Sequence, residues 1–454
     1  MHMQNKTLDM TRGRPVLLML QFAIPMMIGS IFQSLYSMVD TIVVGRFVGA
    51  EALAAIGAAS STVSLLMMVT NGVTGAISIV LSQYFGAGNH KGIKAGVAAA
   101  GHMTVALGVA FGFIFFLLAR PLMNLLNTPA NIIDGSTIYI KLVCGLCVAQ
   151  LAYNGAAAVL RAVGDSKTPL YFLILCSVMN VLLDLIAVIV LRMGVAGVAL
   201  ATVCSQAISA VLCIIYMFRK YPELSLGKAD IRPNWPVLGR LASLGGQMAL
   251  QSTLLSVGMM VITRVINGFG SDVVAAFTVG SNVQNLAAML FSNFSFGFSV
   301  YVGQNYGARR PDRIRQGVKE ITLLVGSLTL LAFALSQIFA NGLVGLYISK
   351  DEVAITAAAL KFVRIQSCFY PFLGWLWLYN STLKGMGEIM YTTLSSVIEL
   401  TCKIALSLLL PIWLGYTGIW LSAPIGWILG LVPGVAYYYS GKWVKKMEEK
   451  PLSA

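Results

Sequence analysis

Long apolar stretches, separated by short polar ones, recur along the whole chain of 454 residues. A helix that crosses a membrane needs about 20 apolar residues, and twelve stretches reach or exceed this length. They lie at 16–44, 52–81, 92–119, 135–160, 169–191, 195–218, 237–266, 273–302, 316–340, 354–383, 391–410 and 418–440. The pattern therefore predicts an all-α membrane protein with twelve transmembrane helices.

The composition supports a membrane protein. Hydrophobic residues make up 57% of the chain and charged residues 11%, against about 25% charged residues in a soluble domain. The mean hydropathy is +0.81. These values exclude a cytosolic enzyme, a secreted domain and a disordered chain. The net charge of +14 is attributed to loops that face the cytoplasm, and no nucleic-acid partner is expected.

The basic residues also orient the chain. With the N-terminus inside, the inner loops and termini hold 22 Lys and Arg residues and the outer loops and helix ends hold 8. Cytoplasmic loops of membrane proteins carry an excess of Lys and Arg. We therefore expect a multi-pass protein of the inner or plasma membrane with both termini in the cytoplasm.

An internal repeat divides the chain into two halves. When residues 49–97 are placed over 270–318 without gaps, 13 of 49 positions are identical. Six helices in each half give both halves the same orientation, so the sequence predicts two six-helix bundles related by a pseudo-two-fold axis along the membrane normal. The predicted parts are an N-lobe at 1–218, a cytoplasmic linker at 219–236, a C-lobe at 237–440 and a basic tail at 441–454.

Two six-helix bundles around a shared cavity are typical of a transporter that works by alternating access. The sequence contains no Walker A motif, and none of its three histidines has a metal-ligand partner at motif spacing. We therefore expect neither an enzyme nor a bound cofactor.

Three acidic residues lie well inside predicted helices: Asp40, Asp184 and Glu399. A charge at the bilayer centre costs roughly 2.5–3.5 kcal/mol, so such groups are usually buried and functional. Asn180 and Asp184 are one helical turn apart. Asn180 and Asp184 would share one polar pocket with Asp40, Asn154 and Thr202 if the helices that carry these residues converge. Such a pocket would hold a proton or an oxygen-coordinated cation such as Na⁺. The alternative is a buried hydrogen-bond network.

The helix that contains Asp40 has two further features. Gln33, Tyr36 and Asp40 share one face because of their spacing. Pro25 precedes them in the same helix and removes a backbone hydrogen bond, which permits a kink. The alternative is a bend without a role in transport.

The second half has a different set of groups in its helices. Glu399 and Lys403 are spaced as an internal salt bridge, which is the alternative to a functional site. Aromatic and Met side chains suit the recognition of flat apolar cations, although most of them are expected to serve packing. The candidates for the wall of a substrate cavity are Gln33, Gln251, Met259, Asn282, Gln284, Met289 and Glu399.

Taken together, these residues resemble the multidrug and toxic compound extrusion (MATE) transporters of prokaryotes. The likeness covers nearly the whole chain. It is carried by Pro25 and Asp40, by Gly49 with the turn 51–57, by the repeated segments 83–87 and 304–308, by the loop 161–165, and by Asn180 with Asp184.

The resemblance implies secondary active export of lipophilic, often cationic, compounds by antiport with Na⁺ or H⁺. The cation site of the family resembles Asp40, Asn180, Asp184 and Thr202 of this chain, with Tyr36 and Asn154 nearby. Small lipophilic cations and membrane lipids are the expected partners of a monomer. The alternative function is a flippase for a lipid-linked precursor, which would need a more basic cavity.

Overall fold

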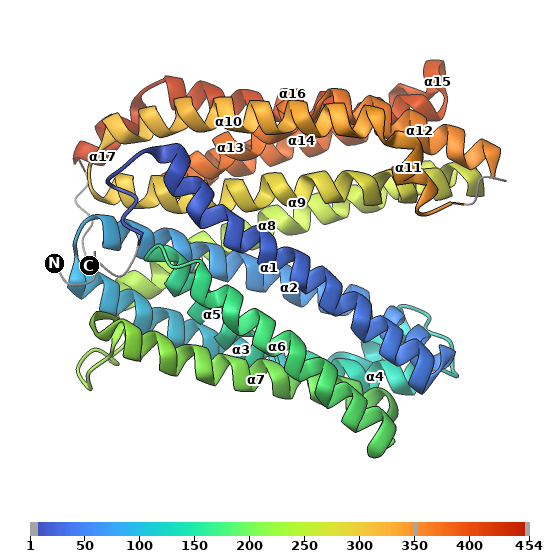
Figure 1. Cartoon of the computed structure of the whole chain (residues 1–454), viewed down its shortest axis with the longest axis horizontal. Helices are drawn as coiled ribbons and strands as arrows, with labels where there is room; N and C mark the ends of the chain where they lie inside the picture. The colour runs from blue at the N-terminus through green and yellow to red at the C-terminus, as the bar shows by residue number, and fades with distance from the viewer. Residues whose placement is uncertain (1–7, 349–351, 450–454) are drawn as a thin grey trace. The chain divides into compact units, whose positions relative to one another are not determined.

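In the computed structural model, residues 8–348 and 352–449 are described, and they form helices joined by short loops (Figure 1). The first half contains α1 Pro15–Val43, α2 Ala50–Gly86, α3 His90–Leu125, α4 Ile133–Val143, α5 Val148–Ala162, α6 Lys167–Leu185 and α7 Gly194–Lys220, with π-helical turns at Val44–Val48 and Ile186–Val190 and a 3₁₀ turn at Pro222–Leu224. The second half contains α8 Trp235–Asn267, α9 Ser271–Gly307, α10 Pro311–Ile338, α11 Ala340–Gly345, α12 Val353–Cys368, α13 Tyr370–Met386, α14 Ile389–Leu409, α15 Pro411–Leu414, α16 Tyr416–Tyr439 and α17 Lys442–Glu449.

Ten described helices are long and apolar enough to cross a membrane, and two bent helix pairs bring the number of spans to as many as twelve. The pairs are α4 with α5, bent by 44°, and α12 with α13, bent by 52°. The sequence predicted each pair as one span, at 135–160 and 354–383. The second break is explained by Pro371 in the first turn of α13, because proline has no N–H to continue the hydrogen bonds of α12.

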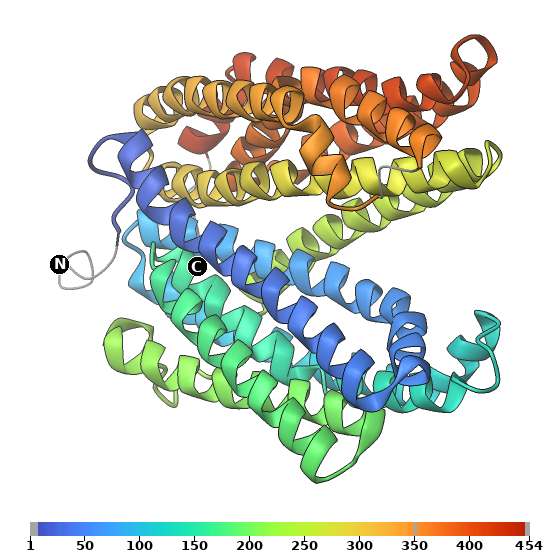
Figure 2. The ribbon, with the colours of Figure 1, turned by 45° about the vertical axis from the view of Figure 1, so that its right-hand side comes forward.

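The helices form two compact units, in each of which the long helices run side by side (Figure 2). Of the described residues, unit 1 contains 8–9 and 21–249, and unit 2 contains 10–20, 250–348 and 352–449. The predicted lobes divide the sequence into two successive parts. The observed units differ, because unit 1 includes the beginning of α8 from the second half and unit 2 includes the beginning of α1 from the first half. The predicted tail at 441–454 forms α17 as far as Glu449, and residues 450–454 lie outside the described part.

Unit 2 holds the beginning of the first span through polar contacts. The backbone N–H of Met10 donates to Oε1 of Gln304 over 2.9 Å, and Nδ2 of Asn305 donates to the carbonyl of Met10 over 3.1 Å. Arg313, which is buried, donates to the carbonyl of Gly13 over 2.9 Å. These contacts satisfy backbone groups that precede α1, including the N–H and carbonyl of Met10, which is buried.

Unit 1 holds the beginning of α8 in a comparable way. Arg240 donates to Oε1 of Gln83, and its guanidinium lies 5.8 Å from the centre of the Tyr84 ring. Gly72 allows α2 to approach α8, since a Cβ at this position would lie 2.7 Å from the carbonyl oxygen of Gly245. The glutamines of the repeated segments 83–87 and 304–308 thus have the same role in the two units.

The loop between α5 and α6 is built around Asp165, which is buried. Its carboxylate accepts hydrogen bonds from the hydroxyl groups of Thr168 (2.6 Å) and Tyr221 (2.7 Å) and from Nζ of Lys220 (2.9 Å). Burial raises the pKa of Asp165, but the hydrogen bonds from Thr168, Lys220 and Tyr221 outweigh burial and hold this pKa below its ordinary value. Part of the loop that carried the family resemblance therefore has a structural role.

We expect Asp165→Asn to lower the stability of the folded chain by about 1–3 kcal/mol, because the charged acceptor of three side-chain donors is lost. The measurement is the apparent melting temperature of the purified protein in detergent. Since the folded pKa lies below the ordinary value, the deficit should be complete at neutral pH and should disappear as the pH falls through the lowered pKa.

Asp134→Asn is the matched control, because the ion pair of Asp134 with Arg120 is largely exposed and contributes little. Equal melting temperatures for the two variants would contradict the role assigned to Asp165.

Candidate functional site

Unit 1 contains a polar cluster in its membrane-spanning part, built by α1, α6 and α7. Asn180 and Asp184 lie one turn apart on α6 and are completely buried. Asp40 of α1 is half-buried, and its carboxyl group lies within hydrogen-bonding distance of that of Asp184. The structure thus brings together the two acids that sequence analysis placed in separate helices of the first half.

Two further groups complete the contacts of this acid pair. With its amide nitrogen directed at Asp184, Asn180 donates to Oδ2 of Asp184 over 2.8 Å, and its oxygen accepts from the hydroxyl of Thr202 over 3.3 Å. Thr202 is buried on α7, and the hydroxyl of Tyr36 lies within hydrogen-bonding reach of its side chain. Carboxyl, amide and hydroxyl oxygens from three helices therefore meet at one point.

Both acids lie within about one helical turn of a π-helical turn. Asp40 lies four residues before the turn Val44–Val48, and Asp184 lies two residues before the turn Ile186–Val190; the two turns contact each other. A π-helical turn interrupts the regular backbone hydrogen bonds and is frequent at functional sites. The backbones of α1 and α6 therefore both become irregular close to the carboxyl group that each helix carries.

The cluster lacks a positive charge to balance its two acids. No basic side chain forms an ion pair with Asp40 or Asp184 within residues 8–348 and 352–449. Oδ1 of each acid is buried, and neither atom meets a hydrogen-bond donor in the described structure. Two carboxyl groups in contact cannot both be ionised cheaply in a low dielectric, so the arrangement can hold a proton or a cation with oxygen ligands.

We did not predict Tyr139 as a neighbour of the acid pair. Tyr139 is buried on α4 and interacts electrostatically with both Asp40 and Asp184. The only signal in the sequence was a phenol within the predicted span 135–160, which is weak because tyrosines are common in such spans. Asn154 is half-buried on α5 and makes no hydrogen bond to any described group, and Gln33 is exposed on α1.

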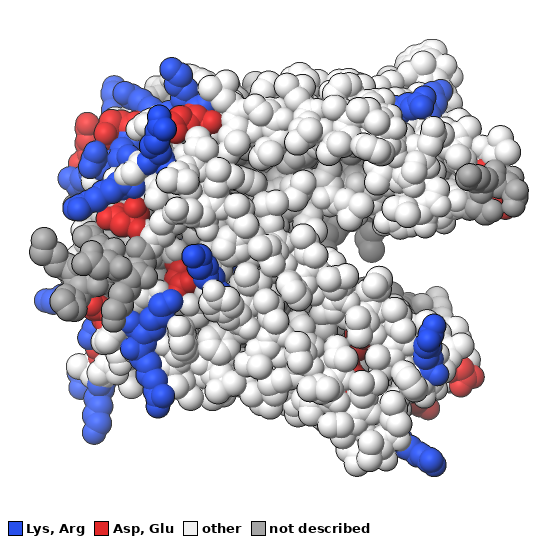
Figure 3. All heavy atoms as spheres, viewed as in Figure 1, with Lys and Arg blue, Asp and Glu red and all other residues white. Residues whose placement is uncertain are grey.

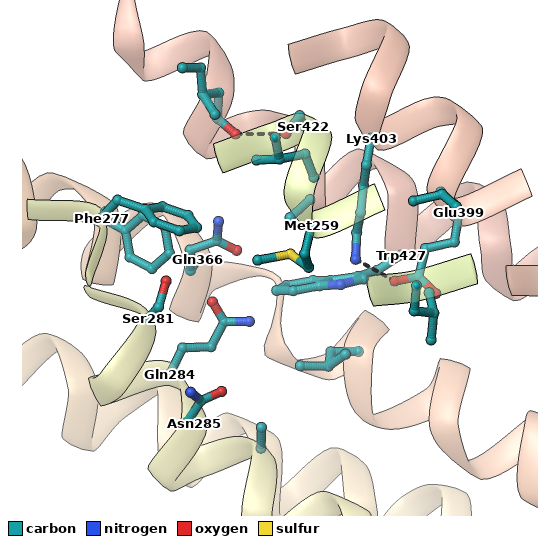
Figure 4. Close-up of a pocket in the computed structure, with 18 of the residues that line it drawn as sticks. Met259, Phe277, Ser281, Gln284, Asn285, Gln366, Glu399, Lys403, Ser422 and Trp427 are labelled. Atoms are coloured by element: carbon teal, nitrogen blue, oxygen red, sulfur yellow. Dashed lines mark hydrogen bonds and ion pairs between the residues drawn. The ribbon is translucent and has the colours of Figure 1, made fainter. Parts of the chain in front are cut away.

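Unit 2 contains a cavity of about 400 Å³ among its membrane-spanning helices (Figure 4). Of the predicted cavity residues, Met259, Gln284 and Glu399 line it. Gln251 instead donates to Oγ of Ser396 over 2.5 Å and to the carbonyl of Thr392, while Asn282 is exposed and Met289 is half-buried outside this cavity. The other side chains labelled in Figure 4 are Phe277, Ser281, Asn285, Gln366, Lys403, Ser422 and Trp427.

One wall of the cavity consists of an ion pair and a tryptophan. Glu399 and Lys403 form an ion pair one turn apart on α14, and Nζ of Lys403 lies 5.8 Å from the centre of the Trp427 ring. The side chains of Glu399 and Lys403 are 10% and 15% exposed, so the pair is largely buried. Gly426 of α16 makes room for it, because a Cβ there would lie 2.7 Å from Cγ of Lys403. The wall combines a neutralised charge pair with an aromatic face.

Comparisons with known proteins agree with this architecture. The family model described as MatE matches the chain twice, over residues 25–186 and 248–409, so that the second match starts 223 residues after the first. The "Probable multidrug resistance protein YpnP" of Bacillus subtilis is 28% identical over 441 residues, which cover 96% of this chain and 98% of the relative. The "Probable multidrug resistance protein YoeA" of the same organism is 25% identical over 440 residues, 94% of this chain and 93% of the relative.

The fold is shared with solved structures. A crystal structure of a MATE protein in the bent conformation superposes with a TM-score of 0.88, covers 98% of this chain and 99% of its own, and is 20% identical. The predicted fold class, an all-α membrane protein of two six-helix bundles, is confirmed by this likeness together with the helical spans.

Glu399→Gln should destabilise the folded chain by about 3–5 kcal/mol, because it leaves Lys403 charged, buried and unpaired. The double variant Glu399→Gln/Lys403→Met removes both charges and should recover most of this loss. Melting temperatures of the purified proteins measure both effects. If the single variant were as stable as the parent chain, the pair would not be the buried ion pair described above.

Proposed function

The chain belongs to the MatE family of membrane transporters, and from this membership we propose that it exports lipophilic cations in exchange for Na⁺ or H⁺. As a member of this family it is a transport protein and not an enzyme. Two relatives that match nearly its whole length are named multidrug resistance proteins, which favours foreign small molecules as substrates.

The observation that carries the proposal is the contact between the carboxyl groups of Asp40 and Asp184. We assign the coupling ion to this point, with Asp40, Asn180, Asp184 and Thr202 as its oxygen ligands if the ion is Na⁺. A proton shared by the two acids would neutralise the same repulsion. In either case the inward driving force is about 2.3 kcal/mol per charge for each 100 mV of membrane potential, plus the chemical gradient.

Ion binding can change the conformation of unit 1 through α1. This helix is continuous through Pro25, whose missing N–H leaves the carbonyl of Gln21 without a helical donor. The boundary between the two units falls in the same place, between Leu20 and Gln21. We assign the predicted kink to Pro25, so that neutralisation of Asp40 changes the direction of α1 on one side of this point. Tyr36 and Asn154 are the neighbours expected to adjust.

The cavity of unit 2 is our candidate for the substrate site. Its volume of about 400 Å³ is in the range of cavities that bind drug-sized molecules. Trp427 and Phe277 offer aromatic faces to a flat cation, and Met259 offers an adaptable apolar surface. The polar residues Gln33, Gln251 and Asn282, together with Met289, remain candidates for other stages of the transport cycle.

The alternative function, a flippase for a lipid-linked precursor, is less well supported. It requires free positive charge in the membrane to hold a pyrophosphate. Lys403 is the only basic residue that lines the unit 2 cavity among the described residues, and Glu399 neutralises it. We also propose that the chain acts as a monomer in the plasma membrane with both termini in the cytoplasm, because the excess of Lys and Arg follows this orientation.

Asp40→Asn and Asp184→Asn should each abolish ion-driven export while leaving the protein folded, because an amide can neither exchange a proton nor offer a charged ligand. The assay is uptake of a fluorescent lipophilic cation into proteoliposomes under an imposed Na⁺ gradient and, separately, a pH gradient. The gradient that drives uptake by the parent chain identifies the coupling ion.

Asp134→Asn serves again as the control, since it removes an exposed carboxylate that is not part of the assigned ion site. Unimpaired transport by folded Asp40→Asn would rule out the assigned ion site. Absence of uptake by the folded parent chain under both gradients would count against antiport itself and would favour the flippase.

A further inference from the structure

Unit 2 has a second cavity, of about 510 Å³, at the end of the bundle where α10 begins and α17 lies. Basic side chains gather over this end of the unit (Figure 3). The cavity is lined by two cations, Arg315 and Lys319, by aromatic rings of α13, α16 and α17, and by no acidic residue of the described chain. Its chemistry is therefore that of a site for an anion with an apolar part.

The two cations are free to meet such an anion. Arg315 and Lys319 lie on successive turns of α10 and are exposed, and neither forms an ion pair with a carboxylate of the described residues. The guanidinium of Arg315 lies 6.0 Å from the centre of the Trp443 ring. Trp443 is fixed in turn, because its indole N–H donates to the carbonyl of Tyr438 over 2.9 Å and its side chain is buried.

Two acidic side chains at this end of the unit have other partners. Glu388 forms an ion pair of 2.5 Å with Lys446 of α17. Glu320 of α10 accepts a hydrogen bond of 2.8 Å from Gln316. Neither acid lines the cavity, so the positive charge of Arg315 and Lys319 is not neutralised from within it.

The corresponding position in the other half is different. In the ungapped repeat, Arg315 corresponds to Lys94, which forms an ion pair of 3.4 Å with Asp230. The residue that corresponds to Lys319 one turn later is Ala98. The two unpaired cations of this cavity therefore have no counterpart at the matching positions of the first half.

Hydroxyl groups add neutral donors beside the cations. The hydroxyls of Tyr379 and Tyr439 are 3.4 Å apart in the lining, and Thr322 follows Lys319 by one turn on α10. Phosphate oxygens accept hydrogen bonds from guanidinium, ammonium and hydroxyl groups alike. The donor set therefore suits a phosphate better than a simple carboxylate, which has only two oxygens.

An apolar stripe leads away from the cavity along α10. Leu323 lines the cavity and is 67% exposed, and Leu330, two turns further on the same face, is 57% exposed. Arg315 and Leu330 are about 22 Å apart along the helix axis, which is close to the length of an acyl chain that enters the bilayer. A soluble phosphate would use the cations and leave this stripe unused, whereas a lipid would use both.

We propose that this cavity binds the phosphate headgroup of an anionic phospholipid, with Arg315 and Lys319 as its cationic ligands and an acyl chain along Leu323 and Leu330. Basic pockets between membrane helices on the side that carries the positive loops are suited to such headgroups. The bound lipid would join α10, α13, α16 and α17 at the membrane surface.

The test uses the full chain purified in detergent. It is incubated with equal amounts of phosphatidylglycerol and phosphatidylcholine, and bound lipids are counted by native mass spectrometry. We expect the parent chain to retain phosphatidylglycerol preferentially, and the double variant Arg315→Gln/Lys319→Gln to lose this preference by roughly tenfold or more. The variant Arg315→Lys/Lys319→Arg keeps both charges and should keep the preference.

Lys91→Gln/Lys94→Gln is the matched control, because it removes two basic residues at the start of α3, the helix that corresponds to α10, and should retain the preference. Equal retention of phosphatidylglycerol by both glutamine variants would overturn the proposal. In a second arm, glycerol 3-phosphate and inorganic phosphate replace the lipid. Stabilisation by these soluble anions equal to that by phosphatidylglycerol, measured as the melting temperature, would overturn the assignment to a lipid.

Discussion

Asp40 and Asp184 approach each other inside unit 1, where two ionised carboxyl groups would repel each other strongly. The surrounding structure keeps the two groups in place. Asn180 donates a hydrogen bond to Asp184 and accepts one from Thr202, while Tyr139 of α4 interacts electrostatically with both acids. Because α1 and α6 each continue into a π-helical turn beside their acid, a change of charge acts where the backbone is least regular. The transport proposal depends on this combination.

The two units differ in whether their buried charges are balanced by a partner of opposite charge. Unit 1 keeps two acids, Asp40 and Asp184, that have no basic partner among the described residues. Unit 2 carries Glu399 with its own counter-charge, Lys403, and this pair is neutral without any ligand. A duplicated bundle can thus hold unbalanced acids in one half, and a neutral charge pair beside an aromatic cavity in the other.

The spans and the acids within them could be predicted from the sequence because each rests on a local property. The repeat could be predicted because its two copies still share residues. Apolar length alone places α2 or α9 within a few residues, and an acid within such a stretch is conspicuous. The breaks between α4 and α5 and between α12 and α13 were not predicted, since hydropathy does not register a bend. The electrostatic influence of the acids on Tyr139 and the hydrogen bond between Gln304 and Met10 depend on packing between distant segments, which a single sequence does not reveal.

The beginnings of α1 and α8 each belong to the unit formed mainly by the other half of the chain, and this arrangement affects biosynthesis. Met10 is bound by Gln304, which follows it by 294 residues and is therefore synthesised long after the first span has entered the membrane. Contacts of such large sequence separation form late. The first span must wait, with its beginning undocked, until most of the second half has been inserted. A nascent chain that stops at the middle loop would retain an incomplete first half, so biogenesis of the two bundles is a joint event despite their descent from one repeated unit.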